Sequence, residues 1–158
     1  MVDENDTILG EASRQNAHHE GLLHRVAVTY LINDAEEILI NERADNGLLD
    51  HSSAGHVDVG ESYLEAAKRE LKEELGVANI ELHEAGSALG SDKSDGEHRR
   101  HMFKIFICKS SPVTLKKDEV RRVYWAKPSE VLKDMEVVPK KYTGGFKSSI
   151  KVFLQRHK

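Results

Sequence analysis

Runs of β-branched and aromatic residues predict most of the strands in this chain. Residues 24–33 (HRVAVTYLIN) and 37–43 (EILINER) are rich in Val, Ile and Leu, and a polar turn separates them. Such residues favour extended structure, so we expect these two segments to form a hairpin. Comparable runs predict further strands at 79–89, 101–108 and 119–126.

Polar segments separate these predicted strands. The charged stretch 90–100 (GSDKSDGEHRR) is expected to be a loop. Residues 7–23 show no clear period and are expected to hold a short strand near Ile8 and Leu9, followed by a loop. Residues 1–6 are acidic and are expected to form a flexible tail.

Helical periodicity is strongest over residues 61–75. This stretch is rich in Leu, Ala, Lys, Arg and Glu, and Gly76 stands where a helix often ends with a glycine. At about 100° per residue one stripe carries a set of apolar side chains, and this stripe is expected to face a sheet. The set is Leu64, Ala67, Leu71 and Leu75.

Two shorter helices are expected near the carboxyl end of the chain. Pro128 is well placed in the first turn of a helix over residues 129–132. Residues 146–156 form an amphipathic pattern after a pair of glycines. Strands and helices thus alternate without a repeat or linker, which predicts an α/β fold with a mixed sheet in a single domain spanning residues 1–158.

Composition agrees with one globular domain. The chain has 158 residues, of which 39% are hydrophobic and 32% are charged, and its net charge is −4. This charge makes a nucleic-acid polymer an improbable partner. A single cysteine, Cys108, excludes an internal disulfide and suits a reducing cytoplasm, and no apolar run is long enough to cross a membrane. We therefore expect a cytoplasmic protein, and leave open whether it forms a homodimer.

Three glutamates gather on one side of the 61–75 helix. Glu70, Glu73 and Glu74 lie on an arc of roughly 100°. Like charges at such spacings repel each other, so the arrangement suggests that a cation sits among them. Carboxylate oxygens suit a hard ion, Mg²⁺ or Mn²⁺. Arg69 precedes Glu73 by four residues and can brace it.

Residues 55–77 (GHVDVGESYLEAAKRELKEELGV) carry a family signature. Gly55, Glu61 and the run from Arg69 to Val77 keep the spacing G-x5-E-x7-R-E-U-x-E-E-x-G-U, in which U is aliphatic. Every defined position is met. The segment resembles the Nudix box, and the resemblance implies the α/β/α sandwich of Nudix hydrolases, with a mixed central sheet.

The resemblance also implies an activity and a set of roles. Nudix hydrolases cleave a diphosphate linked to another group, usually a nucleoside, by attack of water on phosphorus. Glu70, Glu73 and Glu74 would bind the metal together with the carbonyl of Ala54. Arg69, Glu61, Gly55 and Gly76 would orient the site. Glu74 is the first choice for the general base, and Glu119, from a later loop, is the second.

Substrate contacts are less strongly indicated. Arg25 and Arg43, on the two strands of the expected hairpin, are candidates either to bind a phosphate or to form salt bridges at the edge of the sheet. No further motif selects a substrate, so a nucleoside di- or triphosphate or a nucleotide sugar is the default expectation.

Residues outside the Nudix box support an alternative interpretation of the chain. His24, Glu42–Arg43 and the segment Ser53-Ala54-Gly55-His56 resemble a branch that includes isopentenyl-diphosphate isomerase. In that enzyme a catalytic cysteine stands where this chain has Ala54. Its metal site uses histidines matching His24 and His56, but its acidic ligands would fall near Arg99 and His101, and His18 matches only loosely.

The isomerase is therefore disfavoured, and so is a binding module that has lost catalysis, because the glutamates are intact. The chain has nine histidines, but their spacing is not that of a zinc site. His18, His19, His24 and His56 are candidates to converge near the metal loop, but positions at the surface or behind the ligands of that loop are favoured for them.

Overall fold

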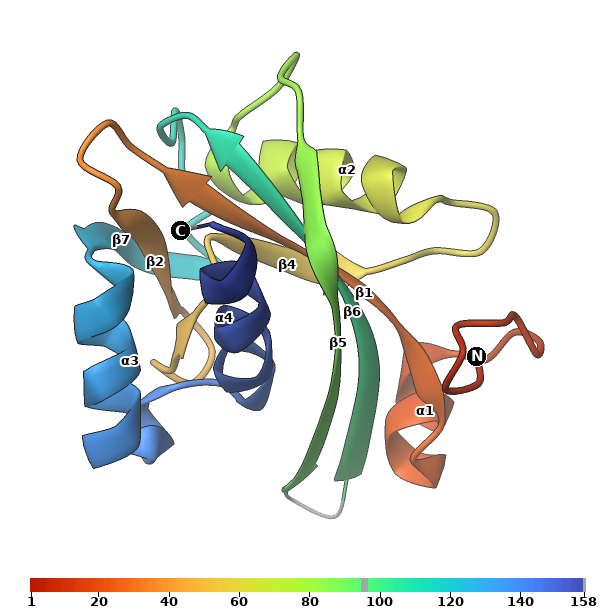
Figure 1. Cartoon of the computed structure of the whole chain (residues 1–158). Coiled ribbons are helices and arrows are strands. Elements are labelled where there is room, and N and C mark those ends of the chain that lie inside the picture. Colours follow the sequence, from red (N-terminus) through yellow and green to blue (C-terminus); the bar gives the residue numbers. More distant parts are fainter. Residues whose placement is uncertain (95–96, 158) are drawn as a thin grey trace.

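The computed structural model describes residues 1–94 and 97–157. Within these residues seven strands form one mixed sheet, which has helices on both faces (Figure 1). The strands are β1 (Leu23–Ile32), β2 (Ile38–Arg43), β3 (Leu49–Asp50), β4 (Ser53–His56), β5 (His83–Ser94), β6 (Glu97–Lys109) and β7 (Val120–Ala126). The helices are α1 (Arg14–Glu20), α2 (Tyr63–Leu75), α3 (Pro128–Val137) and α4 (Gly144–Arg156), with a short 3₁₀ turn η1 (Pro139–Lys141).

Strand β1 is the centre of the sheet. The strand order along the main path is β3-β2-β1-β6-β5, while β4 pairs with β1 and β7 pairs with β2. β1 runs parallel to β6 over its whole length, and the other pairs are antiparallel. Nine of the ten residues of β1 are buried, as a strand covered on both faces requires.

Two apolar cores lie on opposite faces of the sheet. On one face α2 packs through Ala66, Ala67, Leu71 and Leu75 against alternate residues of β1, such as Ala27 and Leu31. On the other face α4 and α3 cover the remaining set, which includes Val28 and Tyr30. Figure 1 shows these helices on either side of the strands. The period of two along β1 divides its side chains between the two cores.

The expected hairpin forms, but it is short. β1 and β2 pair only at Ile32↔Ile38, because β4 then takes the free edge of β1 from Val26 to Thr29. β2 turns away and pairs instead with β3 and β7. This split carries Arg25 and Arg43 apart, although a regular hairpin would place them close together.

The prediction of a loop at residues 90–100 is wrong for the residues that the structure describes. β5 continues to Ser94 and β6 begins at Glu97, so the two strands form a long antiparallel arm, with residues 95–96 outside the described part. Pairs such as Ser91↔Arg100 are polar on both strands. In this outer part of the arm, backbone hydrogen bonds join the strands without an apolar face. The side-chain pattern therefore did not predict strands there.

The amino-terminal region also differs from expectation. Helix α1 was not predicted; it is capped by Ser13, whose hydroxyl accepts from the Asn16 N–H, and by Gly21 at φ 66°. Residues 1–6, expected to form a tail, lie against the sheet. The Val2 N–H donates to the Leu23 carbonyl at 2.9 Å, and the Val2 side chain is buried.

Helix α2 follows the predicted pattern closely. Ser62 and Glu65 form a capping box at its start, and Gly76 ends it at φ 69° with its N–H bonded to carbonyls of the last turn. One position of the predicted apolar stripe is wrong. Leu64 is 39% exposed, whereas Tyr63 and Ala66 are buried in its place. Leu64 lies in the first turn of the helix, which begins at Tyr63, two residues later than the sequence pattern indicated.

Candidate metal and phosphate site

A pocket of about 420 Å³ opens where α2 meets β2 and β4. Two arginines, Arg14 and Arg43, are among the described residues that line it, against eight acidic residues. The acidic residues are Asp45, Asp50, Asp58, Glu70, Glu73, Glu74, Asp118 and Glu119. This excess of carboxylates over guanidinium groups favours the binding of a cation.

Glu74 is the most enclosed of the three glutamates on α2. Its side chain reaches the end of β4, where Ser53 Oγ and the Ala54 N–H each lie 3.4 Å from Oε1, and Asn41 Nδ2 lies 3.4 Å from Oε2. Burial, followed by the charge of nearby Glu70, raises the pKa of Glu74 well above its ordinary value. A raised carboxyl pKa in a cleft is typical of a functional group.

Glu70 is held in place by Arg69. The Arg69 guanidinium donates to Glu70 Oε1 at 2.6 Å, to Glu61 Oε2 at 2.8 Å and to the His56 carbonyl at 3.0 Å. Burial raises the pKa of Glu70 despite its bond to Arg69. The Arg69 guanidinium therefore connects His56 and Glu61, at the two ends of the loop before α2, with Glu70 on α2. These bonds fit the orienting role that the resemblance implies for Arg69.

Gly55 allows the closest approach between the loop and the helix. A Cβ atom at this position would lie 2.1 Å from Cδ of Glu70. The Glu70 carboxyl group therefore occupies the space that any other side chain at position 55 would need. Because Arg69 holds the same carboxyl group, it cannot move aside freely.

Of the remaining candidate residues, three lie at the pocket and one does not. Glu73, Glu119 and Arg43 line the pocket. Glu73 is 46% exposed and lies 3.7 Å from Arg69 Nη1, while Glu119 pairs with Lys116 at 3.0 Å. Arg43 Nη1 lies 3.6 Å from Asp50, and the Arg43 guanidinium also binds Asp45.

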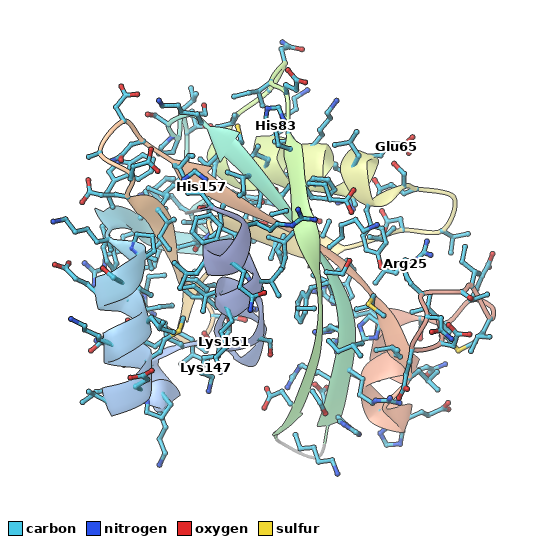
Figure 2. The ribbon with its side chains drawn as sticks, viewed as in Figure 1. Arg25, Glu65, His83, Lys147, Lys151 and His157 are labelled. Carbon is cyan, nitrogen blue, oxygen red and sulfur yellow. The ribbon has the colours of Figure 1, made fainter. Side chains whose placement is uncertain are left out.

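Arg25 lies outside this pocket. Its guanidinium donates to Asp6 Oδ1 and to the Asp6 carbonyl, both at 2.8 Å, and stacks over the Tyr63 ring. Figure 2 shows it on the side of the molecule that carries α1 and the N-terminal segment. Its partners hold the N-terminal segment, so the structure brings only Arg43 of the two candidate arginines to the glutamates.

The sequence did not point to Asn41, Ser53 or Asp50 as parts of the site. Asn41 and Ser53 surround Glu74, and Asp50 lies at the end of β3, where it lines the pocket. None stands in a recognisable motif. Their only common feature is that β2, β3 and β4 meet α2 at one end of the sheet.

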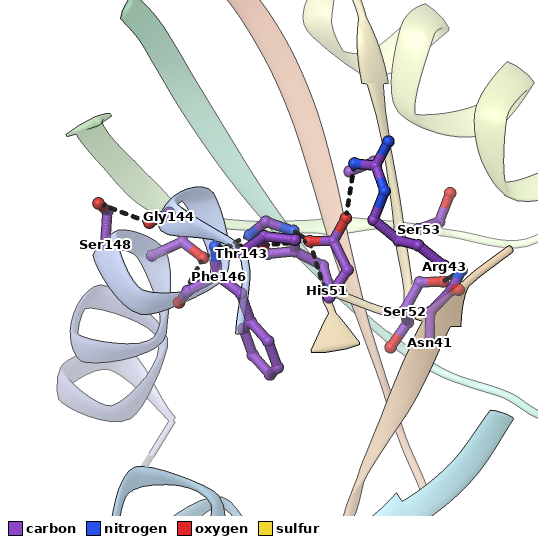
Figure 3. A network of polar contacts seen from close by, with 12 residues as sticks. Asn41, Arg43, His51, Ser52, Ser53, Thr143, Gly144, Phe146 and Ser148 are labelled. Atoms are coloured by element: carbon purple, nitrogen blue, oxygen red, sulfur yellow. Dashed lines mark hydrogen bonds and ion pairs between the residues drawn. The ribbon is translucent and has the colours of Figure 1, made fainter. Parts of the chain in front are cut away.

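Asp50 belongs to a partly buried polar network that reaches α4. Figure 3 shows Arg43, His51 and Thr143 of this network. Oδ1 accepts from the Thr143 hydroxyl at 2.9 Å and lies 2.7 Å from His51 Nδ1. Thr143 in turn caps α4 by accepting from the Phe146 N–H. Burial alone would raise the pKa of Asp50, but His51, Arg43 and Thr143 outweigh it and lower the pKa to about 2. The ionised carboxylate therefore stabilises the fold.

Replacement of Asp50 by Asn should destabilise the protein by about 2 kcal/mol at pH 7, the value of a pKa lowered by nearly two units. Because the folded pKa is depressed, this stabilisation is complete above about pH 4 and disappears as the pH falls towards 2. Urea unfolding of both proteins between pH 7 and pH 3 measures it.

Asp45→Asn is the matched control for this prediction. Asp45 binds the same arginine but is 61% exposed, so its replacement should cost less than about 1 kcal/mol. A difference for Asp50→Asn that stays constant down to pH 3, or that is no larger than for Asp45→Asn, would contradict this account of the network.

The glutamate cluster fits a hard divalent ion. Burial raises the pKa of both Glu70 and Glu74; the charge of Glu73 adds to the effect on Glu70, and the charge of Glu70 adds to the effect on Glu74. A bound cation would reverse this effect by favouring the ionised carboxylates. Oxygen ligands on one helix, with Glu73 more exposed beside them, suit Mg²⁺ or Mn²⁺ better than a thiolate-binding metal. The backbone of Ala54 lies at the same site, through its N–H.

Three of the four histidines that the sequence analysis grouped together converge, and the fourth lies at the surface. His18, His24 and His56 converge with His101, and one ring nitrogen from each lies within 4.8 Å of the others. His19, which was grouped with them, is exposed. The spacing of these histidines along the chain did not reveal the cluster, because its members come from α1, β1, β4 and β6, and the parallel pairing of β1 with β6 places His24 opposite His101. Only the resemblance to the isomerase had connected these positions.

Comparisons of the sequence with a family model and with individual proteins agree on one family. The NUDIX domain model matches residues 22–144. The uncharacterized Nudix hydrolase YfcD of Escherichia coli K12 is 32% identical over 137 residues, which cover 83% of this chain and 74% of YfcD. An isopentenyl-diphosphate Delta-isomerase of Pectobacterium atrosepticum is 29% identical over 153 residues, covering 92% of this chain and 85% of the isomerase.

Among solved structures, DR0079 from Deinococcus radiodurans superposes with a TM-score of 0.77 at 21% identity, covering 99% of this chain and 97% of DR0079. This likeness confirms the expected fold class, in which helices cover both faces of a mixed sheet. Within the described residues no helix is long and apolar enough to cross a membrane.

Proposed function

Because this chain belongs to the Nudix hydrolase family, we propose that it cleaves the diphosphate linkage of a nucleoside diphosphate derivative by attack of water on phosphorus. The proposed substrates are a nucleoside di- or triphosphate or a nucleotide sugar, with Mg²⁺ or Mn²⁺ as cofactor. The proposal rests on one observation: the buried Glu74 and the partly buried Glu70, both with raised pKa values, line one pocket that is rich in carboxylates.

Each residue of the pocket has a role in this proposal. Mg²⁺ bound by Glu70, Glu73 and Glu74, and by the Ala54 carbonyl, would neutralise charge on the diphosphate and lower the pKa of a bound water. Arg69 and Glu61 fix the loop against α2, and Gly55 leaves room for the Glu70 carboxyl group. Arg43 faces the pocket and can bind a phosphate oxygen.

The general base is proposed to be Glu74, with Glu119 as the alternative. Glu74 is in contact with β4 and is enclosed, so its proton affinity depends on the charge around it. Glu119 lies across the pocket on the segment before β7 and is half exposed. Its bond to Lys116 would have to break before it could accept a proton from water.

An isomerase acting on isopentenyl diphosphate is the second candidate. It is supported by the relative from Pectobacterium atrosepticum, which matches 92% of this chain. Ala54 argues against it, because a methyl group can neither donate a proton nor attack a carbon. The intact glutamates of α2 support the hydrolase instead.

A substrate screen tests the proposal. The purified chain is incubated with nucleoside di- and triphosphates, nucleotide sugars and isoprenyl diphosphates. Released phosphate and diphosphate are measured directly, and again after the products have been treated with a phosphatase. We expect at least one nucleotide to be cleaved when Mg²⁺ or Mn²⁺ is present and none when EDTA removes the metal.

Two outcomes would contradict the proposal. Cleavage that continues unchanged in EDTA would exclude the metal site on α2. Conversion of isopentenyl diphosphate to its isomer, detected by chromatography without any release of phosphate, would favour the isomerase.

A further inference from the structure

A second cavity lies between the N-terminal segment and the loop that precedes α2. Its volume is about 360 Å³, which is within the range of small-molecule pockets. Ile8 and Glu11 line it from the N-terminal segment, Arg14 lines it from α1, and Val59 lines it from the loop. None of the four proposed metal ligands is among its lining residues, so this cavity is distinct from the glutamate pocket at α2.

The second cavity adjoins the glutamate pocket. Arg14, His56 and Asp58 line both of them. A molecule whose diphosphate group is bound at the glutamates can therefore extend past these three residues into the second cavity. A diphosphate substrate carries a further group on one of its phosphates, and this group needs a place outside the acidic pocket.

Hydrogen bonds hold the N-terminal wall of the second cavity in place. The Asp6 carboxylate accepts from Arg25 Nε at 2.8 Å and from the Tyr63 hydroxyl at 2.9 Å. These bonds connect the N-terminal segment to β1 and to the first turn of α2. The Val2 N–H also donates to the Leu23 carbonyl at 2.9 Å. Because the wall is already ordered, a ligand pays little entropy to form it.

The loop wall is held in the same way. The Asp58 N–H donates to Glu61 Oε1 at 3.1 Å, and the Glu61 N–H donates to the Asp58 carbonyl at 3.0 Å, so these two residues close a turn. Arg69 binds the Glu61 carboxylate through Nε and Nη2. The position of Val59 in this turn is therefore coupled to the arginine that also holds Glu70.

Two branched apolar side chains of this cavity are open to solvent. Ile8 is 67% exposed and Val59 is 71% exposed, although both line the same cavity. Apolar side chains that gather in this way often mark a ligand site, because a ligand that covers them removes apolar surface from water. Their exposure favours a ligand group that has apolar faces.

The polar groups of the cavity narrow the class of ligand. Among the described residues, neither the Glu11 carboxylate nor the Arg14 guanidinium has a hydrogen-bond or ion-pair partner. An alkyl chain would remove water from these charged groups without replacing its hydrogen bonds. A nucleobase has two apolar faces and an edge with donors and acceptors, so it can pack against apolar side chains and also bond to the charged groups.

We propose that the second cavity binds the base of a nucleotide whose diphosphate lies at the glutamates, with Ile8 and Val59 packing against the faces of the ring. This inference rests on the proposed hydrolysis of a nucleoside diphosphate derivative, and it adds the residues that hold the base. The N-terminal segment and the loop before α2 are then parts of the substrate site.

Binding of analogues that resist cleavage tests this assignment. The probes are the α,β-methylene analogues of ADP, GDP, CDP and UDP, in which carbon replaces the bridging oxygen. The reference probe is the monomethyl ester of methylenediphosphonate, which has the same charged groups but no nucleoside. Calorimetry in excess Mg²⁺ measures the dissociation constants. We expect at least one nucleotide analogue to bind at least about tenfold more tightly than the methyl ester.

Matched variants identify the residues that hold the base. Ile8→Ser and Val59→Ser should each weaken binding of the preferred nucleotide analogue about fivefold and leave binding of the methyl ester unchanged. Both side chains are exposed, so neither change disturbs a core. Val113→Ser changes a residue that is 73% exposed and lines neither cavity, so it should alter neither affinity. Circular dichroism checks that each variant folds.

The proposal is overturned if Ile8→Ser and Val59→Ser bind every nucleotide analogue as the wild type does, or if no analogue binds more tightly than the methyl ester. It is also overturned if isopentenyl diphosphate binds more tightly than every nucleotide analogue and loses this advantage in both variants, since an alkyl chain would then occupy the cavity. Absence of hydrolysis in the substrate screen, with analogue binding still sensitive to both variants, would contradict the hydrolase alone.

Discussion

Replacement of Glu74 by Gln is expected to lower the rate of diphosphate hydrolysis by at least about 10²-fold, and replacement of Glu73 by Gln should have an effect of similar size. Glutamine keeps the volume but loses the charge that binds a metal and the basicity that accepts a proton. Steady-state kinetics at saturating Mg²⁺, with the best nucleotide from the substrate screen, measure the change.

Stability should respond differently from activity. Glu74 is buried beside Glu70 and its pKa is raised, so without metal its charge opposes folding. Glu74→Gln should therefore fold at least as stably as the wild type in EDTA. Glu136→Gln, an exposed position on α3, is the control and should change neither quantity. Normal turnover by folded Glu74→Gln would remove Glu74 from the mechanism.

Gly55→Ala is expected to lower the hydrolysis rate by about 10²-fold, although it adds a single methyl group. The new Cβ would overlap the Glu70 carboxyl group, which Arg69 holds in place, so Glu70 must move by an ångström or more. Displacements of this size in a catalytic site cost factors of this order. Kinetics at increasing Mg²⁺ should also show weaker apparent metal binding.

The control for this variant is another glycine with room for a side chain. At Gly144 an added Cβ would meet nothing closer than 3.5 Å, so Gly144→Ala should be neutral for activity. Gly55→Ala should unfold at a lower urea concentration than the wild type, because moving Glu70 aside breaks its bond to Arg69, but circular dichroism should show that it is folded in the absence of urea. Wild-type rates for Gly55→Ala would show that the position of Glu70 is unimportant.

Local sequence was sufficient wherever local chemistry decides the structure. The capped helix α2, its glycine end and the arc of Glu70, Glu73 and Glu74 depend on residues within a few positions of each other. Strands β1 and β2 were similarly visible from their β-branched residues. Family resemblance added the fold class.

Long-range pairing decided the features that sequence reasoning missed. The outer part of the β5–β6 arm, residues 90–94 and 97–100, has no apolar period. Helix α1 is only seven residues long. Neither segment therefore carries a strong local signal. The separation of Arg25 from Arg43 depends on β4 occupying the edge of β1, which no residue near either arginine indicates.

The amino-acid sequence by itself determined the acidic helix and the glycines that shape its loop, because each follows from contacts between near neighbours. The class of fold came from the resemblance to a family. Only the tertiary structure decided which distant side chains share a site. Asn41 and Ser53 reach Glu74, and His18 and His101 join His24 and His56, because strand pairing brings together positions as far as 83 residues apart. Such proximity depends on how the whole sheet closes.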